Sequence, residues 1–514
     1  MKVLTAAQMR EIDRRTVERG VPSLILMENA GHRVVEFLAQ RFAPLAAQRI
    51  VVICGKGNNA GDGLVAARQL LTRYKPSALQ VVLTAQPQEL RGDAEANYRM
   101  FVACGGVAVP EIRTEMRSAS LVLDALLGTG LSGPVTGRYA ELIHEMNSGF
   151  PLAKIVAVDI PSGMASDAGT SQGGCVRASY TVTFTAPKLG QVLSPNCDSL
   201  GELIVAPIGS ASELYENDSS ITTALSQAQD FTHLFAPRPR DSNKGMYGHV
   251  LVLAGGRGKT GAAAMSGIAA LRAGAGLVTV ASAESAIDAI ASHAPELMTD
   301  PLEETEEGAI STLSSATLQK TLERKTLVAM GPGMGTHRQT IQLVRKLFAE
   351  VKLPMVVDAD GLNAVAGSDF HGPGPLRVLT PHPGEMARLC GKTVQEVQAD
   401  RLGIARGFAA ERGVYVVLKG DRTVIALPDG RVWINPTGSP AMATGGTGDI
   451  LTGLVAGFVA QFPQEPETAV RAAVWLHGRA GELGTAELGE KSLIATDLLL
   501  FLPQAMRECA DHRN

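Results

Sequence analysis

Short apolar runs recur along the first part of the chain, and each is followed by a glycine-rich or polar turn and then by a helical pattern. These runs occupy residues 49–54, 80–84, 121–127, 154–160, 180–185 and 201–206. Unbroken apolar runs of this length are typical of strands that are buried on both faces of a parallel sheet. The repeated strand–helix unit therefore predicts a doubly wound α/β domain, preceded by helices over residues 5–19 and 24–42.

A second α/β series begins after a stretch without periodicity. Between residues 209 and 243 serine, aspartate, glutamine and proline accumulate, which is typical of a domain boundary. Apolar runs then return at residues 248–254, 277–281, 326–330, 354–358, 378–380 and 414–418. The predicted fold class is α/β, with a Rossmann-like doubly wound domain over residues 1–215, a linker over 216–243 and a second α/β domain over 244–514.

Length and composition agree with two such domains. A chain of 514 residues is too long for one hydrophobic core, and 45% hydrophobic and 19% charged residues are ordinary for a soluble protein. A net charge of −4 argues against nucleic acid or anionic lipid as a partner. The six cysteines show no paired spacing, the N-terminus has no apolar signal segment, and no apolar run is long enough to span a bilayer. We therefore expect a cytoplasmic protein with reduced thiols.

A glycine-rich loop lies between residues 435 and 449, directly before an apolar helical pattern over 450–458. Free backbone N–H groups at the start of a helix, at the positive end of its dipole, favour an anion such as phosphate. Asp449 falls in the predicted first turn, where a carboxylate beside phosphate suits a general base or a metal-linked role. The alternative is a glycine-rich loop with an acidic capping residue. Several strand-end loops should gather at the same sheet edge, and this favours the phosphate site.

Polar residues also follow the strands of the first domain. The run over 49–54 leads into a turn that contains Asn58, Asn59 and Asp62, and a helix is predicted from residue 64. Their oxygens could coordinate a hard cation or hold polar groups of a ligand. A plain turn is the alternative, because Asn and Asp tolerate left-handed backbone. Asp124 and Asp159 lie at the ends of two later strands, on the side where open α/β sheets bind ligands.

Taken together, these motifs resemble those of a known family. Gly-Gly-Thr-Gly-Asp at residues 445–449 resembles the phosphoryl-binding loop of the ribokinase-like superfamily, and residues 358–363, 379–385 and 419–423 resemble its ADP/ATP-dependent NAD(P)H-hydrate dehydratase branch. Residues 57–63, 128–134 and 159–163, with Asp124, resemble NAD(P)H-hydrate epimerases. Their order over nearly the whole chain is similar to that of the bacterial bifunctional NAD(P)H-hydrate repair enzymes. The resemblance implies that the second domain is ribokinase-like.

The resemblance implies repair of nicotinamide cofactors that carry water across a double bond of the reduced ring. The C-terminal domain would transfer a phosphoryl group from ADP, with magnesium, to the hydroxyl of the S hydrate; elimination would then restore NAD(P)H and release AMP and phosphate. Asp449 would take the hydroxyl proton, and the amides of residues 445–448 would hold the developing charge. The sequence does not fix ADP against ATP, although the fused arrangement favours ADP by analogy.

The same resemblance implies the residues that bind the ligands. In the dehydratase domain, the predicted hydrate contacts are Ala262, Gly333, His382 and Asp449, and the predicted nucleotide contacts are Lys419, Gly420, Asp421, Arg422, Thr423, Gly445, Gly446, Thr447 and Gly448. In the epimerase domain, which would interconvert the R and S hydrates, the predicted substrate contacts are Asn58, Asn59, Ala60, Gly61, Asp62, Gly128, Thr129, Gly130, Leu131, Ser132, Gly133, Pro134, Tyr139 and Asp159. Asn59, Asp124 and Ser162 would hold a potassium ion, and Asp159 would handle the proton during inversion.

Four alternatives stay open at this point. The chain could be a ribokinase-like vitamin-precursor kinase fused to a nucleotide-binding module, or its N-terminal domain could bind nucleotide without catalysis. His382 could be structural, and Asp159 could be bound only to backbone N–H groups. The expected partners are the hydrates of NADH and NADPH (NADHX and NADPHX) and ADP. We expect a homo-oligomer that binds neither nucleic acid nor membrane.

Overall fold

The chain divides into two compact units, Met1–Thr223 and Ala224–Asn514. The structure, a computed structural model, describes residues 1–131, 133–372 and 374–511. The division falls inside the segment 216–243 that the sequence predicts as a linker. That segment is not without structure, because β8 (Thr223–Leu225) joins the sheet of the second unit and a 3-10 helix spans Ala228–Phe235. None of the described helices is long and apolar enough to cross a membrane.

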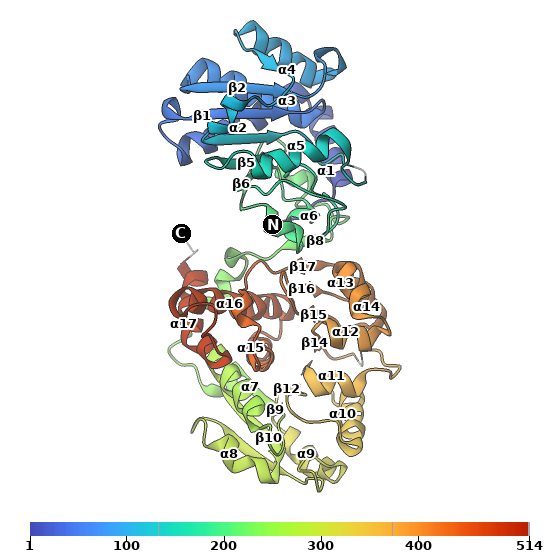
Figure 1. Cartoon of the computed structure of the whole chain (residues 1–514). Coiled ribbons are helices and arrows are strands. Elements are labelled where there is room, and N and C mark those ends of the chain that lie inside the picture. The colour runs from blue at the N-terminus through green and yellow to red at the C-terminus, as the bar shows by residue number, and fades with distance from the viewer. Residues whose placement is uncertain (132, 373, 512–514) are drawn as a thin grey trace. The chain divides into compact units, whose positions relative to one another are not determined.

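The first unit is built on one parallel sheet, whose described strands run in the order β3-β2-β1-β4-β5-β6-β7 (Figure 1). The strands are β1 (Arg49–Cys54), β2 (Ala78–Leu83), β3 (Ala108–Val109), β4 (Leu121–Ala125), β5 (Lys154–Val158), β6 (Tyr180–Phe184) and β7 (Glu202–Ala206). The helices are α1 (Ala6–Glu18), α2 (Ser23–Arg41), α3 (Asn58–Gln69), α4 (Gly92–Ala103), α5 (Gly137–Ser148) and α6 (Leu189–Val192). The strand order reverses between β1 and β4, and ligands bind at such a switch point.

Alternate residues of the central strands pack on opposite faces of this sheet. Ile50 and Val52 belong to the core beneath α2, α3 and α4, whereas Val51 and Ile53 belong to the core beneath α5. A strand covered on both faces needs apolar side chains at every position, which explains the unbroken apolar run at 49–54. The prediction of a doubly wound domain is confirmed.

The second unit contains a larger, mixed sheet. Its described strands run in the order β11-β10-β9-β12-β13-β14-β15-β16-β17-β8; the pairs from β11 to β15 are parallel, and β15, β16 and β17 pair antiparallel. The strands after β8 are β9 (His249–Leu253), β10 (Leu277–Ala283), β11 (Met298–Leu302), β12 (Leu327–Met330), β13 (Met355–Val357), β14 (Arg377–Leu379), β15 (Tyr415–Leu418), β16 (Val424–Ala426) and β17 (Val432–Ile434).

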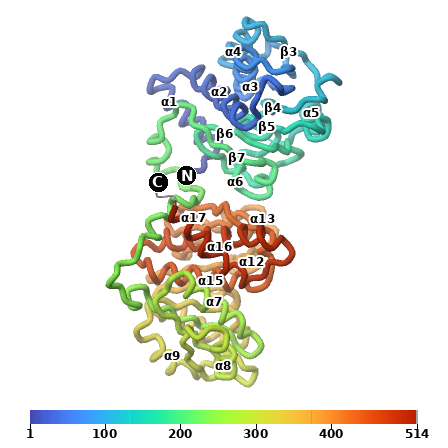
Figure 2. The backbone as a smooth tube through the Cα atoms, turned by 90° about the vertical axis from the view of Figure 1, so that its left-hand side faces the viewer, coloured from blue at the N-terminus to red at the C-terminus, as the bar shows by residue number. Residues whose placement is uncertain are grey.

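Two layers of helices enclose this sheet. On one side lie α7 (Thr260–Ala273), α8 (Ile287–Ala291), α15 (Thr447–Gln461), α16 (Pro466–Leu488) and α17 (Leu498–Asp511), which Figure 2 shows face-on. On the other side lie α9 (Ser315–Leu322), α10 (Arg338–Glu350), α11 (Ala359–Val365), α12 (Pro383–Cys390), α13 (Val394–Ala399) and α14 (Arg401–Arg412) (Figure 1). Val250 and Val252 pack toward the first layer and Leu251 and Leu253 toward the second. The predicted α/β fold of this domain is therefore confirmed.

One helix begins earlier than the sequence predicts, and one that it does not predict follows β13. Helix α3 starts at Asn58 rather than at residue 64, so Asn58, Asn59 and Asp62 lie in its first turns and not in an irregular loop. Asn and Asp are accepted there because the first helical N–H groups lack intrahelical partners. The acidic segment after β13 is likewise helical, because Asp358 is the N-cap of α11.

Candidate active sites

The start of α15 is held rigidly by its own loop. Gly446 is the N-cap and has a left-handed backbone with φ of 96°. The Thr447 hydroxyl donates to the carbonyl oxygens of Met442 and Thr444, each at 3.1 Å. The partly buried His477 ring donates from Nε2 to the Thr447 carbonyl at 2.9 Å, and desolvation lowers the pKa of this histidine to about 4. The free N–H groups of α15 are thus fixed in direction, as an anion site requires.

Substitution of Gly446 tests this geometry. Gly446→Ala should lower the free energy of unfolding of the second unit by about 1–2 kcal/mol, because a side chain is unfavourable in left-handed backbone. The added Cβ would also lie 2.7 Å from Met265 Cε. Gly445→Ala is the matched control, because no atom lies within 4 Å of a Cβ at that position. Denaturant unfolding measures both variants, and equal stabilities would contradict the assigned backbone.

A partly buried cation lies beside this helix start. Lys419, after β15, contacts Asp358 Oδ1 through Nζ at 2.6 Å, and Glu385 Oε2 lies 3.8 Å from the same Nζ. Burial opposes the charge of Lys419, but Asp358 and Glu385 outweigh it and the pKa of the lysine is raised. A Cβ on Gly448 would lie 3.4 Å from Lys419 Nζ, so the positive charge directly adjoins the α15 backbone.

Asp449 faces these charges from the first turn of α15. Its pKa is raised to about 6. Burial is the main cause, the negative charge of Asp358 acts in the same direction, and Lys419 opposes the shift. Asp358 is held by Lys419 and by the Thr452 hydroxyl, which donates to Oδ2 at 2.8 Å. The two aspartates therefore differ in role: Asp358 is part of an ion pair, whereas Asp449 can accept a proton near neutral pH.

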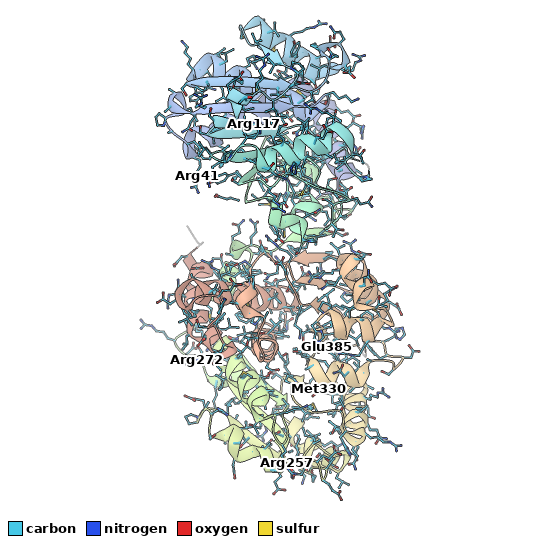
Figure 3. All side chains as sticks on the ribbon, in the orientation of Figure 1. Arg41, Arg117, Arg257, Arg272, Met330 and Glu385 are labelled. Atoms are coloured by element: carbon cyan, nitrogen blue, oxygen red, sulfur yellow. The ribbon has the colours of Figure 1, made fainter. Side chains whose placement is uncertain are left out.

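His382 lies at the edge of the same cavity with a defined orientation. Its Nδ1 accepts the Gly384 N–H at 3.0 Å, so Nε2 carries the proton and is the donor. Its own backbone N–H donates to Glu385 Oε2 at 2.8 Å. Figure 3 shows Glu385 inside the unit, in contrast to Arg257 and Arg272 at its periphery. The side chain of His382 is half exposed and caps α12, and its Nε2 lies 3.5 Å from Glu385 Oε1.

The first unit holds a second site, at the C-terminal ends of β4 and β5. Asp124 is fully buried and accepts from the Ser162 hydroxyl at 2.5 Å and from the Ser162 N–H at 2.7 Å. Asn59 donates to the Leu127 carbonyl at 2.9 Å, and the Ser162 hydroxyl lies 3.2 Å from the same oxygen. Two of the three residues predicted to bind potassium, Asn59 and Ser162, thus meet at one carbonyl group, and the third, Asp124, contacts Ser162.

Asp159 forms an ion pair at the same end of the sheet. Its Oδ1 accepts from Lys188 Nζ at 2.5 Å and from the Thr183 hydroxyl at 3.0 Å. Gln191 Nε2 donates to the Asp159 carbonyl at 2.7 Å and fixes its backbone, which has a left-handed φ of 63°. The alternative that Asp159 is bound only to backbone N–H groups is wrong, because a buried lysine is its closest partner.

Comparison with known proteins gives a family match for each of the two units. Residues 250–504 match the family model of NAD(P)H-hydrate dehydratase, and residues 23–190 match that of the YjeF-related protein N-terminus. A bifunctional NAD(P)H-hydrate repair enzyme from Moorella thermoacetica is 42% identical over 526 residues, which cover 99% of this chain and 97% of the relative. A protein of the same name from Thermofilum pendens is 40% identical and covers 99% of this chain and 96% of its own.

The chain belongs to the bifunctional NAD(P)H-hydrate repair enzyme family. A solved structure of a ribokinase-like superfamily protein from Enterococcus faecalis agrees with the fold of its second unit; it is 27% identical, has a TM-score of 0.50, and covers 58% of this chain and 99% of that one.

In this member of the repair-enzyme family, most predicted dehydratase residues line one cavity of about 720 Å³. Those in its wall are His382, Lys419, Gly420, Asp421, Thr423, Gly446, Thr447, Gly448 and Asp449. Four predicted residues are not part of this wall: Ala262, Gly333, Arg422 and Gly445. Ala262 and Gly333 are neighbours, since a Cβ on Gly333 would lie 3.1 Å from that of Ala262. Arg422 donates instead to the Pro436 carbonyl at 3.4 Å.

The predicted epimerase residues line a cavity of about 640 Å³ in the first unit. Those in its wall are Asn58, Asn59, Asp62, Gly128, Thr129, Gly130, Leu131, Tyr139 and Asp159. Ala60 and Gly61 are buried within α3 instead, and Gly133 and Pro134 are exposed outside the wall. Ser132 lies outside the described residues.

Sequence reasoning missed several residues of both walls. Asp358, Glu385 and His477 line the second cavity, and Lys188 and Asp13 line the first. The sequence around Lys188 indicates a functional or structural role, because a lysine directly after a buried strand and within an apolar segment requires a buried partner. The sequence around Asp13 gives no such indication, since this residue lies in a helix with an ordinary amphipathic pattern.

Proposed function

We propose that this chain repairs hydrated nicotinamide cofactors in two steps. The first unit interconverts the R and S hydrates, and the second unit dehydrates the S hydrate with ADP to give NAD(P)H, AMP and phosphate. The observation that carries the proposal is the position of Asp449, on the first turn of a glycine-capped helix and in the same cavity wall as Lys419, His382 and Asp358. This combination supplies a base, free N–H groups and a fixed cation to a phosphoryl transfer.

The dehydration consists of a phosphoryl transfer to the substrate hydroxyl, followed by elimination of phosphate. Asp449 takes the proton of the substrate hydroxyl, whose oxygen bonds to the β-phosphorus of ADP as AMP departs. The carbon–oxygen bond then breaks with its electron pair on the phosphate, assisted by the lone pair of the ring nitrogen. Loss of a proton from the adjacent carbon restores the double bond. The Gly446–Gly448 amides and Lys419 stabilise the phosphoryl charge, and His382 Nε2 is placed to donate to the substrate.

Magnesium fits this cavity. Asp358, Glu385 and Asp449 face a single lysine in its wall, so a nucleotide phosphate would meet excess negative charge without a further cation. Asp358 and Glu385 would hold the ion, which supplies charge neutralisation at the phosphates when it is bound. ADP rather than ATP stays our proposal for the phosphoryl donor.

The raised pKa of Asp449 predicts a pH dependence for dehydration. A base must be ionised, and burial beside Asp358 moves the pKa of Asp449 up to about 6. The kcat/KM for dehydration of the S hydrate should therefore be constant above pH 7 and fall about tenfold per pH unit below about 6. A profile that stays flat down to pH 4.5 would contradict the role of Asp449 as base.

A potassium ion fits the first unit for an independent reason. Asn59 Oδ1 is buried and, among the described residues, has no hydrogen-bond partner, and burial raises the pKa of the Asp124 carboxyl to about 6. A hard monovalent cation would satisfy the free amide oxygen and keep the carboxylate ionised. Asn59, Asp124 and Ser162 would hold it, and it would fix the loop that begins at Leu127.

Thermal unfolding tests this ion without reference to activity. Potassium chloride should raise the melting temperature of the first unit relative to tetramethylammonium chloride at the same ionic strength, because a ligand of the native state stabilises it. The rise should disappear in Asp124→Asn and persist in the control Asp167→Asn, which lies outside this group of ligands. Equal melting temperatures in the two salts would reject the site.

Product analysis separates the dehydratase from a ribokinase-like kinase. With the S hydrate and ADP, the proposal predicts equimolar NAD(P)H, AMP and inorganic phosphate. A kinase would accumulate a phosphorylated acceptor and release no phosphate. A cytoplasmic location and a homo-oligomeric assembly stay predictions from the sequence.

A further inference from the structure

Helix α1 forms one wall of the cavity in the first unit. Met9, Arg10, Asp13 and Val17 all line it. The helix is anchored at its start, where the Ala6 N–H donates to Asp167 Oδ1 at 2.7 Å and Thr5 forms a capping box. Ile12 and Met9 also pack into a small core. The position of α1 is therefore fixed by contacts that do not involve Asp13.

The carboxyl group of Asp13 is not neutralised by a neighbour. Its Oδ1 is buried and has no hydrogen-bond partner within the described part of the chain. The charged residues that share the cavity wall with it are Arg10, Lys56, Asp62, Asp93, Asp159 and Lys188. Lys188 has no N–H group left to donate to Asp13. Its Nζ already donates to Asp159 Oδ1 at 2.5 Å, to the Thr183 hydroxyl at 2.8 Å and to the Phe184 carbonyl at 3.1 Å.

Two carboxyl groups of this cavity hold a proton more tightly than an exposed carboxyl does. Burial is the main cause that raises the pKa of Asp13 to about 6; the charge of Asp159 acts in the same direction and Lys188 opposes it. Burial also raises the pKa of Asp62 well above its ordinary value, and the charges of Asp159 and Asp13 add to the shift. Asp159 differs from both because it is in direct contact with Lys188. A carboxyl group with a raised pKa is suited to act as a general acid.

Inversion of the hydrate needs both an acid and a base. The hydroxyl leaves a carbon next to the ring nitrogen only if its oxygen gains a proton, because hydroxide is a poor leaving group. Return of water to the opposite face of the resulting cation requires that a proton be removed. Asp159 can serve as the base, and the resemblance to known epimerases assigns no acid.

We propose that Asp13 is a further catalytic residue of the first cavity, which donates its proton to the departing hydroxyl of the hydrate. The inference rests on the proposed epimerisation. The carbon–oxygen bond breaks with its electron pair on oxygen, water is formed, and the lone pair of the ring nitrogen stabilises the cation. Water adds to the other face, and its proton passes to Asp159. Asp62, which lies in the same cavity wall as Asp13 and Asp159, returns the proton from Asp159 to Asp13, so the cycle balances.

The test compares Asp13→Asn with Glu11→Gln in the full chain. Glu11 is an exposed carboxylate of the same helix that pairs with Arg14. Interconversion of purified R and S hydrates, followed by chromatography, should fall about 100-fold in Asp13→Asn and stay unchanged in Glu11→Gln. Asp13→Glu should recover part of the rate, because it keeps an acid. In the unaltered chain the kcat/KM for epimerisation should fall as the pH rises above about 6, because Asp13 loses its proton. This fall should be absent from the pH profile of Asp13→Asn.

Each outcome either supports or overturns the role of Asp13 as the acid. Dehydration of the pure S hydrate and the melting temperature show whether the variant is folded. An unchanged rate in Asp13→Asn overturns the inference, as does a loss of rate that keeps the pH limb, because the residue would then only position others. If the unaltered chain does not interconvert the hydrates at all, the proposed epimerisation fails and this inference fails with it.

Discussion

Asp449→Asn should lose ADP-dependent dehydration by about 1,000-fold, which is within the range expected when a general base is removed. The substitution removes the base and little else. The contact that Ser266 makes with Asp449 is to the backbone carbonyl, at 3.0 Å, so the substitution keeps it. Lys419 keeps Asp358 as its partner. The variant should therefore fold, bind ADP and interconvert the hydrates as the unaltered chain does.

The matched control is Asp429→Asn, which removes an exposed carboxylate from the turn between β16 and β17. It should keep full dehydratase activity. Regeneration of NADH from the S hydrate, read by absorbance, measures both variants. A loss of less than tenfold in Asp449→Asn would show that another group takes the hydroxyl proton.

Asp159→Asn should lower epimerisation by about 100-fold and also destabilise the first unit. The loss of stability does not come from the backbone, because asparagine accepts a left-handed φ such as the 63° of this residue. It comes from the loss of the negative charge beside Lys188. Lys188 is only 1% exposed, and removal of its carboxylate partner leaves a buried cation, which costs about 3 kcal/mol.

A double variant separates the two effects. Asp159→Asn combined with Lys188→Met removes the unpaired cation, so it should recover most of the stability and none of the epimerase activity. Lys188→Met alone should reduce activity, because the Asp159 carboxylate then loses the lysine that holds it in position. Recovery of activity in the double variant would contradict the role of Asp159 as base.

The strands and the glycine-rich loop before α15 were predictable because their signals are local. The apolar run at 49–54 is buried on both faces of a parallel sheet, and Gly446 and Asp449 adopt the helix start that their order in the sequence indicates. The antiparallel strands β16 and β17 were missed, since each has only three residues and no distinct pattern.

The contacts that complete the sites could not be predicted, because they join distant segments. Lys419 and Asp358 are 61 residues apart, and neither residue indicates the other in the sequence. His477 lies in α16 and reaches Thr447 only through the packing of α16 against α15. Asp13 belongs to a helix whose polar face resembles any solvated face. Only the tertiary structure shows that this face turns toward the cavity.

The most direct measurement supplies the chain with a mixture of R and S NADH hydrate, ADP and magnesium, and follows the absorbance of NADH. With both units active, the whole mixture should be converted, because the first unit replenishes the S hydrate that the second consumes. Conversion of the S fraction alone would contradict the proposed epimerase, and no recovery of NADH would contradict the account as a whole.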